Sequence, residues 1–177
     1  MKKVIYTLIS LLVVVSGLVF ANCENKNETS TPKPLPTAEL TAGLKRWEAT
    51  LDGIKFKAWE ASPEGKKVLD GAAKIKTHIN AFTHMEAVVT SLSLPPGSRL
   101  GFGVMVKIKD DDYILSFGLG KPDEFQQLRS LKVNDKIIIK SRSVSYAPKY
   151  SYPIVSGDYV ERDHKIIYKR APRKGGC

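Results

Sequence analysis

Residues 102–117 read FGVMVKIKDDDYILSF, and this stretch decides the fold that the sequence predicts. Its first half places an apolar side chain at every second position: Phe102, Val104, Val106 and Ile108. A period of two is typical of a strand with one buried face. Three acids, Asp110–Asp112, then form a turn, and Tyr113–Phe117 returns as the next strand. The stretch therefore predicts a β-hairpin.

Further strands are expected on both sides of this hairpin. Met85–Leu94 is rich in β-branched residues and ends at the turn cluster Pro95-Pro96-Gly97-Ser98. Pro122–Leu131, with apolar residues three apart, predicts a short helix. The remaining predicted strands are Lys136–Tyr146, Ile154–Val160 and an edge segment, Ile166–Tyr168.

The part that precedes these strands has helical spacing. After Thr37, a suitable N-cap, apolar residues recur four, three and four positions apart: Leu40, Leu44, Trp47 and Leu51. Ser62-Pro63-Glu64 is a second helix start. It is followed by apolar residues at helical spacing: Val68, Ala72, Ile75 and Ile79. Between the two, Ile54–Ala58 is compatible with a short strand or with a continuing helix. Residues 37–82 are therefore expected to be mainly helical, and the fold class to be α+β.

Three strands, a helix and two more strands are the element order of the OB-fold, which this part of the chain resembles. The phrase LKVNDKIII at Leu131–Ile139 is similar to the stretch that leads into strand four of bacterial OB proteins. Asn134 stands where Gly is usual, and Asn also tolerates a left-handed turn. The resemblance is to exported proteins of the tRNA-anticodon-binding-like group. It implies an OB-like five-stranded β-barrel over residues 83–168, with a helix between strands 3 and 4.

The N-terminus is typical of an export signal over residues 1–22. Lys2 and Lys3 precede the apolar stretch Val4–Val15, and small residues follow up to Ala21. A transmembrane anchor is the alternative, because Val4–Ala21 is about long enough to cross a bilayer. The polar, Thr- and Pro-rich residues 23–36 predict a disordered tether between an anchor and a domain.

Two cleavage sites fit this signal. Val19-Phe20-Ala21 suits ordinary signal peptidase, which would leave Asn22 first. Phe20–Cys23 resembles the lipobox of bacterial lipoproteins, which implies that Cys23 is the lipid attachment site, although Phe20 and Asn22 differ from the usual residues. The chain has two cysteines, and if Cys23 is not acylated, it could pair with Cys177 in an oxidising compartment. Residues 169–177 are expected to form a basic flexible tail.

The formal charge of +10 favours anionic partners. Removal of the signal takes away Lys2 and Lys3 but no acid, which leaves about +8. An anionic glycan, a lipid headgroup or an envelope protein is the expected partner, with membrane attachment through a lipid anchor. Nucleic acid is disfavoured by the export signal. The outward positions of the second predicted strand, Gly103, Met105 and Lys107, also lack the aromatic platform of a single-strand binder.

A ligand of an OB-like domain would contact the face of strands two and three and the two loops beside it. Cations and aromatic residues are interleaved in that region, a mixture that can bind charged sugars or nucleotides. The ligand-binding candidates are Arg99, Lys107, Lys140, Arg142, Tyr146, Lys149, Tyr150 and Tyr152. Exposed strands also carry such residues without any ligand.

No catalytic, metal or cofactor constellation is expected. The carboxylates Asp158, Glu161 and Asp163 are the candidates for an acid/base pair of a hydrolase. Asp110–Asp112 is interpreted as a solvated turn rather than as a calcium site. The sequence thus predicts a non-catalytic bacterial envelope protein, exported and lipid-anchored. A single-stranded nucleic-acid binder, an envelope hydrolase and an assembly protein are the alternatives.

Overall fold

The structure is a computed structural model that describes residues 37–171. By its internal contacts, the chain divides into Met1–Thr41 with Gly175–Cys177, and Ala42–Lys174. Of the first unit, only residues 37–41 are described, at the start of helix α2. The predicted export signal, Cys23, the tether and Cys177 lie outside the described residues.

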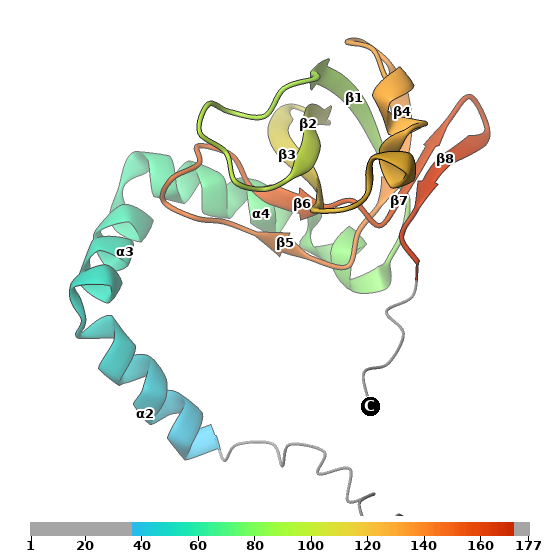
Figure 1. Cartoon of the computed structure of the whole chain (residues 1–177). Coiled ribbons are helices and arrows are strands. Elements are labelled where there is room, and N and C mark those ends of the chain that lie inside the picture. The colour runs from blue at the N-terminus through green and yellow to red at the C-terminus, as the bar shows by residue number, and fades with distance from the viewer. Residues whose placement is uncertain (1–36, 172–177) are drawn as a thin grey trace, which may run out of the picture. The chain divides into compact units, whose positions relative to one another are not determined.

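Within residues 37–171, three helices precede the strands (Figure 1): α2 (Thr37–Glu48), α3 (Leu51–Ala61) and α4 (Pro63–Ala81). Side-chain caps explain the two breaks between them. Thr50 Oγ1 accepts the Gly53 N–H at 3.1 Å, and Ser62 Oγ accepts the Gly65 N–H at 3.0 Å. Residues 54–58, whose state the sequence left open, therefore lie inside α3, and a proline begins α4 as expected.

The strands form one eight-stranded sheet. They are β1 (Met85–Ser91), β2 (Phe102–Ile108), β3 (Asp111–Gly118), β4 (Lys136–Lys140), β5 (Val144–Ser145), β6 (Ile154–Ser156), β7 (Tyr159–Arg162) and β8 (Lys165–Lys169). Their order across the sheet is β5-β6-β3-β2-β1-β4-β7-β8. The β3–β6 pair is parallel and the other neighbours are antiparallel. The β2–β3 hairpin lies where the period-two pattern predicts it.

The α+β class is correct, but the five-stranded barrel is wrong, because the strands form an open, mixed sheet of eight. Two predicted strands are each broken in the structure. In residues 136–146, Ser141 Oγ accepts the Ser143 N–H at 3.2 Å. This local hydrogen bond competes with strand pairing in the segment that separates β4 from β5 along the chain. In residues 154–162, Gly157 and Asp158 separate β6 from β7.

The helix expected between strands three and four is also wrong in kind. Two short 3₁₀ segments, η1 (Pro122–Phe125) and η2 (Leu128–Ser130), occupy this place. The apolar residues Phe125, Leu128 and Leu131 are each three apart, which matches the three residues per turn of a 3₁₀ helix. All three are buried in the main core.

Helix α4 covers part of the sheet through small residues as well as large ones (Figure 1). Ile75 and Ile79 belong to the main core with β-strand residues. The buried Tyr113 hydroxyl of β3 donates to the Gly71 carbonyl of α4 at 2.9 Å. A Cβ added at Gly71 would lie 3.1 Å from Pro153 Cγ, so this glycine permits the close approach of helix and sheet. The Asn134 turn is left-handed as expected, with φ of 73°.

Strands β2 and β3 are covered on their other face as well. Met105 and Ile114 pack there with Tyr150 and Ile154, and side chains of the flanking loops join this second cluster. Met105, expected to point outward beside Gly103 and Lys107, is only 9% exposed. The face of strands two and three is thus filled by the protein's own side chains near its centre.

Candidate functional site

A groove of about 650 Å³ opens where the ends of β4, β7 and β8 meet the residue that ends α4. It is lined by both cations and aromatic rings. Its charged and aromatic members are Phe82, Lys140, Arg142, Asp158, Tyr159, Lys169 and Arg170. We refer to this site as the basic groove. It contains Lys140 and Arg142, two of the ligand-binding candidates that the sequence predicts.

The register of three neighbouring strands forms one wall of the basic groove. Lys140 of β4 is directly opposite Tyr159 of β7, and Tyr159 is directly opposite Lys169 of β8. Directly paired residues present their side chains on the same face of a sheet. Cation, aromatic ring and cation therefore form a row across the three strands.

Phe82 supports two of the cations from the end of α4. It is the C-cap and has a left-handed backbone with φ of 50°, and its N–H bonds the carbonyls of His78 and Ile79. The Arg142 guanidinium lies over the Phe82 ring, 4.0 Å from its centroid. Lys140 Nζ lies 5.7 Å from the same centroid and 5.2 Å from that of Tyr159. Cation–π attraction thus positions both charges without neutralising them.

The Tyr159 ring is itself fixed by a hydrogen bond. Its hydroxyl donates to Glu161 Oε2 at 2.6 Å, and this bond, together with burial, raises the pKa of Tyr159. The ring therefore stays neutral at physiological pH, and its face supports Lys140.

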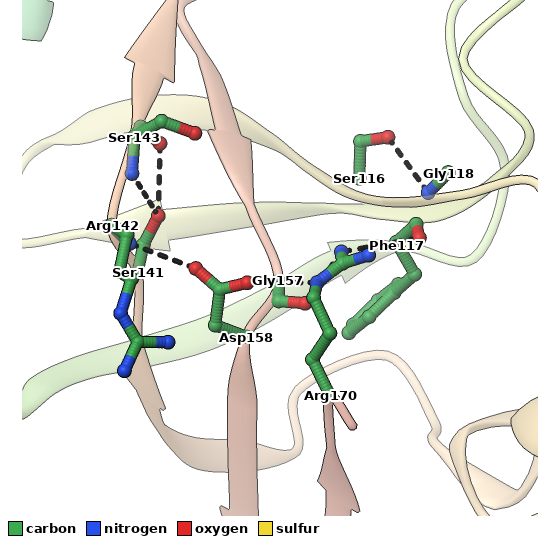
Figure 2. A network of polar contacts seen from close by, with 9 residues as sticks. All are labelled: Ser116, Phe117, Gly118, Ser141, Arg142, Ser143, Gly157, Asp158 and Arg170. Atoms are coloured by element: carbon green, nitrogen blue, oxygen red, sulfur yellow. Dashed lines mark hydrogen bonds and ion pairs between the residues drawn. The ribbon is translucent and has the colours of Figure 1, made fainter. Parts of the chain in front are cut away.

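Asp158 and Arg170 also line the basic groove, and Figure 2 shows the polar network that joins them. Asp158 Oδ1 accepts from Arg170 Nε at 2.8 Å, and Oδ2 accepts the Arg142 N–H at 2.8 Å. Arg170 Nη2 also donates to the carbonyls of Phe117 and Gly157. Asp158 is 7% exposed. Its carboxylate therefore bonds Arg142 and Arg170, just past the ends of β4 and β8, rather than solvent. This network holds the Arg142 backbone at the edge of the groove.

The charges that line the groove are four cations and one carboxylate, a net of +3. Asp158 pairs with Arg170. Within residues 37–171, the side chains of Lys140, Arg142 and Lys169 have no hydrogen-bond acceptor and no carboxylate within bonding distance. An arrangement of this kind can bind an anion directly.

Four other candidates lie together in the loops over β2 and β3, where they bond and pack with each other. Tyr150 is 7% exposed, and its hydroxyl accepts the Arg99 N–H at 3.3 Å and lies 3.4 Å from Ser98 Oγ. The Ser98 bond, then the Arg99 N–H, lowers the pKa of Tyr150. Lys149 Nζ donates to the Gly97 carbonyl, and Tyr152 packs against the second cluster. Tyr150 and Tyr152 thus pack within the loop region, whereas the side chains of Arg99 and Lys149 are exposed.

The last two candidates lie apart from both groups. Tyr146 stacks on Phe56 and Trp59 of α3, with ring centroids 6.4 and 6.1 Å away. Lys107 lines a separate pocket of about 530 Å³ with Lys136, Glu86 and other residues. The structure thus distributes the eight predicted residues over four places, and two of them line the basic groove.

The sequence did not identify the partners that complete the groove. Phe82, Tyr159, Lys169 and Arg170 come from three different elements or their ends, and pairing across strands has no local signature. Lys169 and Arg170 fell in the predicted C-terminal tail, whereas Lys169 ends β8 and Arg170 bonds three other residues. The signal that could have found Lys169 is the β-prone run Ile166–Tyr168 between two lysines, a composition typical of an edge strand.

The three carboxylates considered for hydrolysis do not share a cleft. Asp158 lines the basic groove, whereas Glu161 and Asp163 both line the other pocket, together with Lys107 and two further lysines. Asp163 has a side chain that is 91% exposed and lies 3.7 Å from Arg162 Nε. Among residues 37–171, no group of three His, Cys, Asp or Glu side chains is arranged to hold a metal ion. Asp111, predicted to lie in a solvated turn, begins β3 instead and pairs with Lys74 of α4 at 2.7 Å.

No protein-family model, curated protein or solved structure matches this chain. None of the helices within the described part of the chain has the length and apolar character needed to cross a bilayer. The candidate function therefore depends on the chemistry of the basic groove.

Proposed function

We propose that this chain is a non-catalytic, exported envelope protein that binds an anionic ligand in the basic groove. One observation carries the proposal: Lys140, Arg142 and Lys169 line a single groove with no carboxylate partners of their own among the described residues. Clustered cations without partners repel one another. An anionic ligand would relieve that repulsion, and the aromatic rings keep two of the cations in place for it.

The experiment compares two double variants that remove the same charge. K140A/R142A removes two groove cations, and K66A/K67A removes two exposed lysines of α4 that line no described pocket. Lys66 lies roughly 24 Å along the helix from Phe82, at 1.5 Å per residue. Binding of the full chain to dextran sulfate, with neutral dextran as the blank, is measured by calorimetry over a range of salt concentrations.

We expect K140A/R142A to weaken dextran sulfate binding by at least about tenfold and to lower the salt dependence by roughly two released ions. K66A/K67A should retain most of the affinity. Equal losses in both variants would mean that net charge alone attracts the polymer, and the proposed groove would then be wrong.

The export and anchoring part of the proposal rests on the N-terminal sequence. The intact mass of the protein recovered from membranes tests it, because a diacyl or triacyl increment on Cys23 requires the lipoprotein route. C23S should abolish the increment and release the protein from the membrane fraction. A mature chain that starts at Asn22 would contradict lipid anchoring and leave ligand binding untouched.

A further inference from the structure

We infer that the ligand of the basic groove carries at least two phosphate groups, an inference that rests on the proposed function. The chemistry of Arg142 is the first reason. Its Cζ lies 4.0 Å from the centroid of the Phe82 ring, and none of its side-chain N–H groups has a partner among residues 37–171. These unpaired N–H groups form the planar fork of a guanidinium, which bonds two oxygens of one phosphate or carboxylate.

The positions of the other cations indicate more than one anionic group. Lys140 and Lys169 flank Tyr159 in the register of β4, β7 and β8. Adjacent strands lie about 4.8 Å apart, so the backbones of the two lysines are about 10 Å apart. A single phosphate is narrower than this row. A ligand with two phosphates can span it, with one group near Lys140 and Arg142, which share the Phe82 ring, and the other near Lys169.

The rings of the basic groove argue against recognition by stacking. Arg142 and Lys140 lie over Phe82, and Lys140 lies also over Tyr159. A sugar ring or a base that approached these ring faces would have to displace a cation. The rings therefore serve to hold charges, and the ligand is recognised by its anionic groups rather than by a flat surface.

The charge of the groove favours phosphate over carboxylate. Its lining residues carry a net +3. A phosphomonoester carries about −1.5 to −2 at pH 7 and has three acceptor oxygens. Two such groups match the charge of the groove, and their oxygens exceed those of two carboxylates. The Asp158–Arg170 pair lies beneath the cations and keeps its own charges satisfied.

The test uses titration calorimetry of the full chain with tripolyphosphate, orthophosphate, citrate and a short single-stranded oligonucleotide. We expect tripolyphosphate to bind at least about tenfold more tightly than orthophosphate or citrate, since it alone has several phosphate groups, whose oxygens can reach Lys140 and Lys169 together. R142K keeps the charge but loses the fork, and it should weaken tripolyphosphate binding about tenfold. F82L, which alters no charge, should also weaken it, and circular dichroism establishes that both variants are folded.

Citrate that binds as tightly as tripolyphosphate would overturn the phosphate inference, as would an R142K variant with unchanged affinity. An oligonucleotide that binds more tightly than tripolyphosphate would replace it with nucleic-acid recognition. The dextran sulfate measurement distinguishes failure of the phosphate inference from failure of the proposed function. If dextran sulfate binds in the groove but tripolyphosphate shows no preference over citrate, only this inference fails; if no anion binds there, the proposed function fails with it.

Discussion

Asp158 Oδ1 and Arg170 Nε are 2.8 Å apart in the lining of the basic groove, and this ion pair joins the residue before β7 to the residue after β8 (Figure 2). The backbone repeats the connection, because the Arg170 N–H donates to the Asp158 carbonyl at 2.9 Å. The same carboxylate accepts the Arg142 N–H. A single side chain thus sets the distance between a cation that faces the groove and the edge strand that supplies Lys169.

Replacement of this carboxylate should destabilise the protein. We expect D158N to lower the free energy of unfolding by about 2 kcal/mol, less than for a fully buried pair, because the Arg170 side chain is 36% exposed. Urea denaturation measures the change. D163N is the matched control, with a carboxylate that is 91% exposed, and should change stability by less than about 0.5 kcal/mol. Equal effects in both variants would show that Asp158 is not a structural carboxylate.

The contact between helix α4 and the sheet should depend on the Tyr113 hydroxyl. Y113F removes the 2.9 Å bond to the Gly71 carbonyl and should cost about 1 kcal/mol at neutral pH. Burial, and secondarily the charge of Asp111, raises the pKa of Tyr113 from 10.0 to about 12. Because the folded pKa is the higher one, this contribution is complete below pH 10 and is lost as the pH rises toward 12.

Alkaline denaturation of the two proteins checks this expectation. The advantage of the wild type over Y113F should shrink above pH 10 and be gone by about pH 12. Y152F is the control, because the Tyr152 hydroxyl has no hydrogen-bond partner among the described residues. A constant difference between wild type and Y113F across this range would contradict the raised pKa.

Asp135, in the turn before β4, should make the stability of the fold partly sensitive to acid. Burial opposes ionisation of Asp135, but the Lys132 N–H and the Arg162 guanidinium outweigh it and lower the pKa of Asp135 below 3.8. A lowered folded pKa contributes stability above pH 3.8 that is lost as the pH falls below that value. D135N should therefore be less stable than the wild type by about 1 kcal/mol at neutral pH and equal to it in strong acid.

Denaturation at a series of pH values measures this difference. D123N is the control, since Asp123 is exposed in η1 and its carboxylate has no partner within residues 37–171. A gap between wild type and D135N that persists in strong acid would mean that the turn depends on the shape of Asp135 rather than on its charge.

Local patterns predicted the local structure well. The alternation in residues 102–108 and the acids after it specify the β2–β3 hairpin, because side-chain period and turn chemistry act over a few residues. The helix cap at Ser62 and the left-handed turn at Asn134 could be predicted from the sequence for the same reason. The class of the fold follows from such signals, whereas the number and pairing of the strands does not.

The barrel and most of the site required long-range information. Ser141 and Ser143 bond each other and interrupt a strand that composition alone would continue. Tyr150 has the character of a ligand-binding aromatic residue, yet it packs over Met105 and Ile114 because its loop folds back on β2 and β3. Lys140 faces Lys169 across Tyr159 only after β4, β7 and β8 pair, and no spacing along the chain encodes that register.

A variant of Tyr146 can distinguish a ligand-binding role of this residue from a structural one. The chain has two tryptophans, Trp47 and Trp59, and both contact Phe56, with ring centroids 5.5 and 5.4 Å away. Tyr146 stacks on Phe56 and Trp59 and is 39% exposed. Y146A should therefore shift the tryptophan emission to the red and cost about 1 kcal/mol of stability, the usual worth of an aromatic pair.

Ligand affinity decides between the two roles. Tyr146 does not line the basic groove, so Y146A should bind tripolyphosphate as tightly as the wild type does. S145A, a change at the exposed neighbouring position, should leave both the emission and the affinity unchanged. If Y146A instead kept the emission of the wild type and lost affinity, Tyr146 would be a ligand contact, and the binding surface would extend from the groove to helix α3.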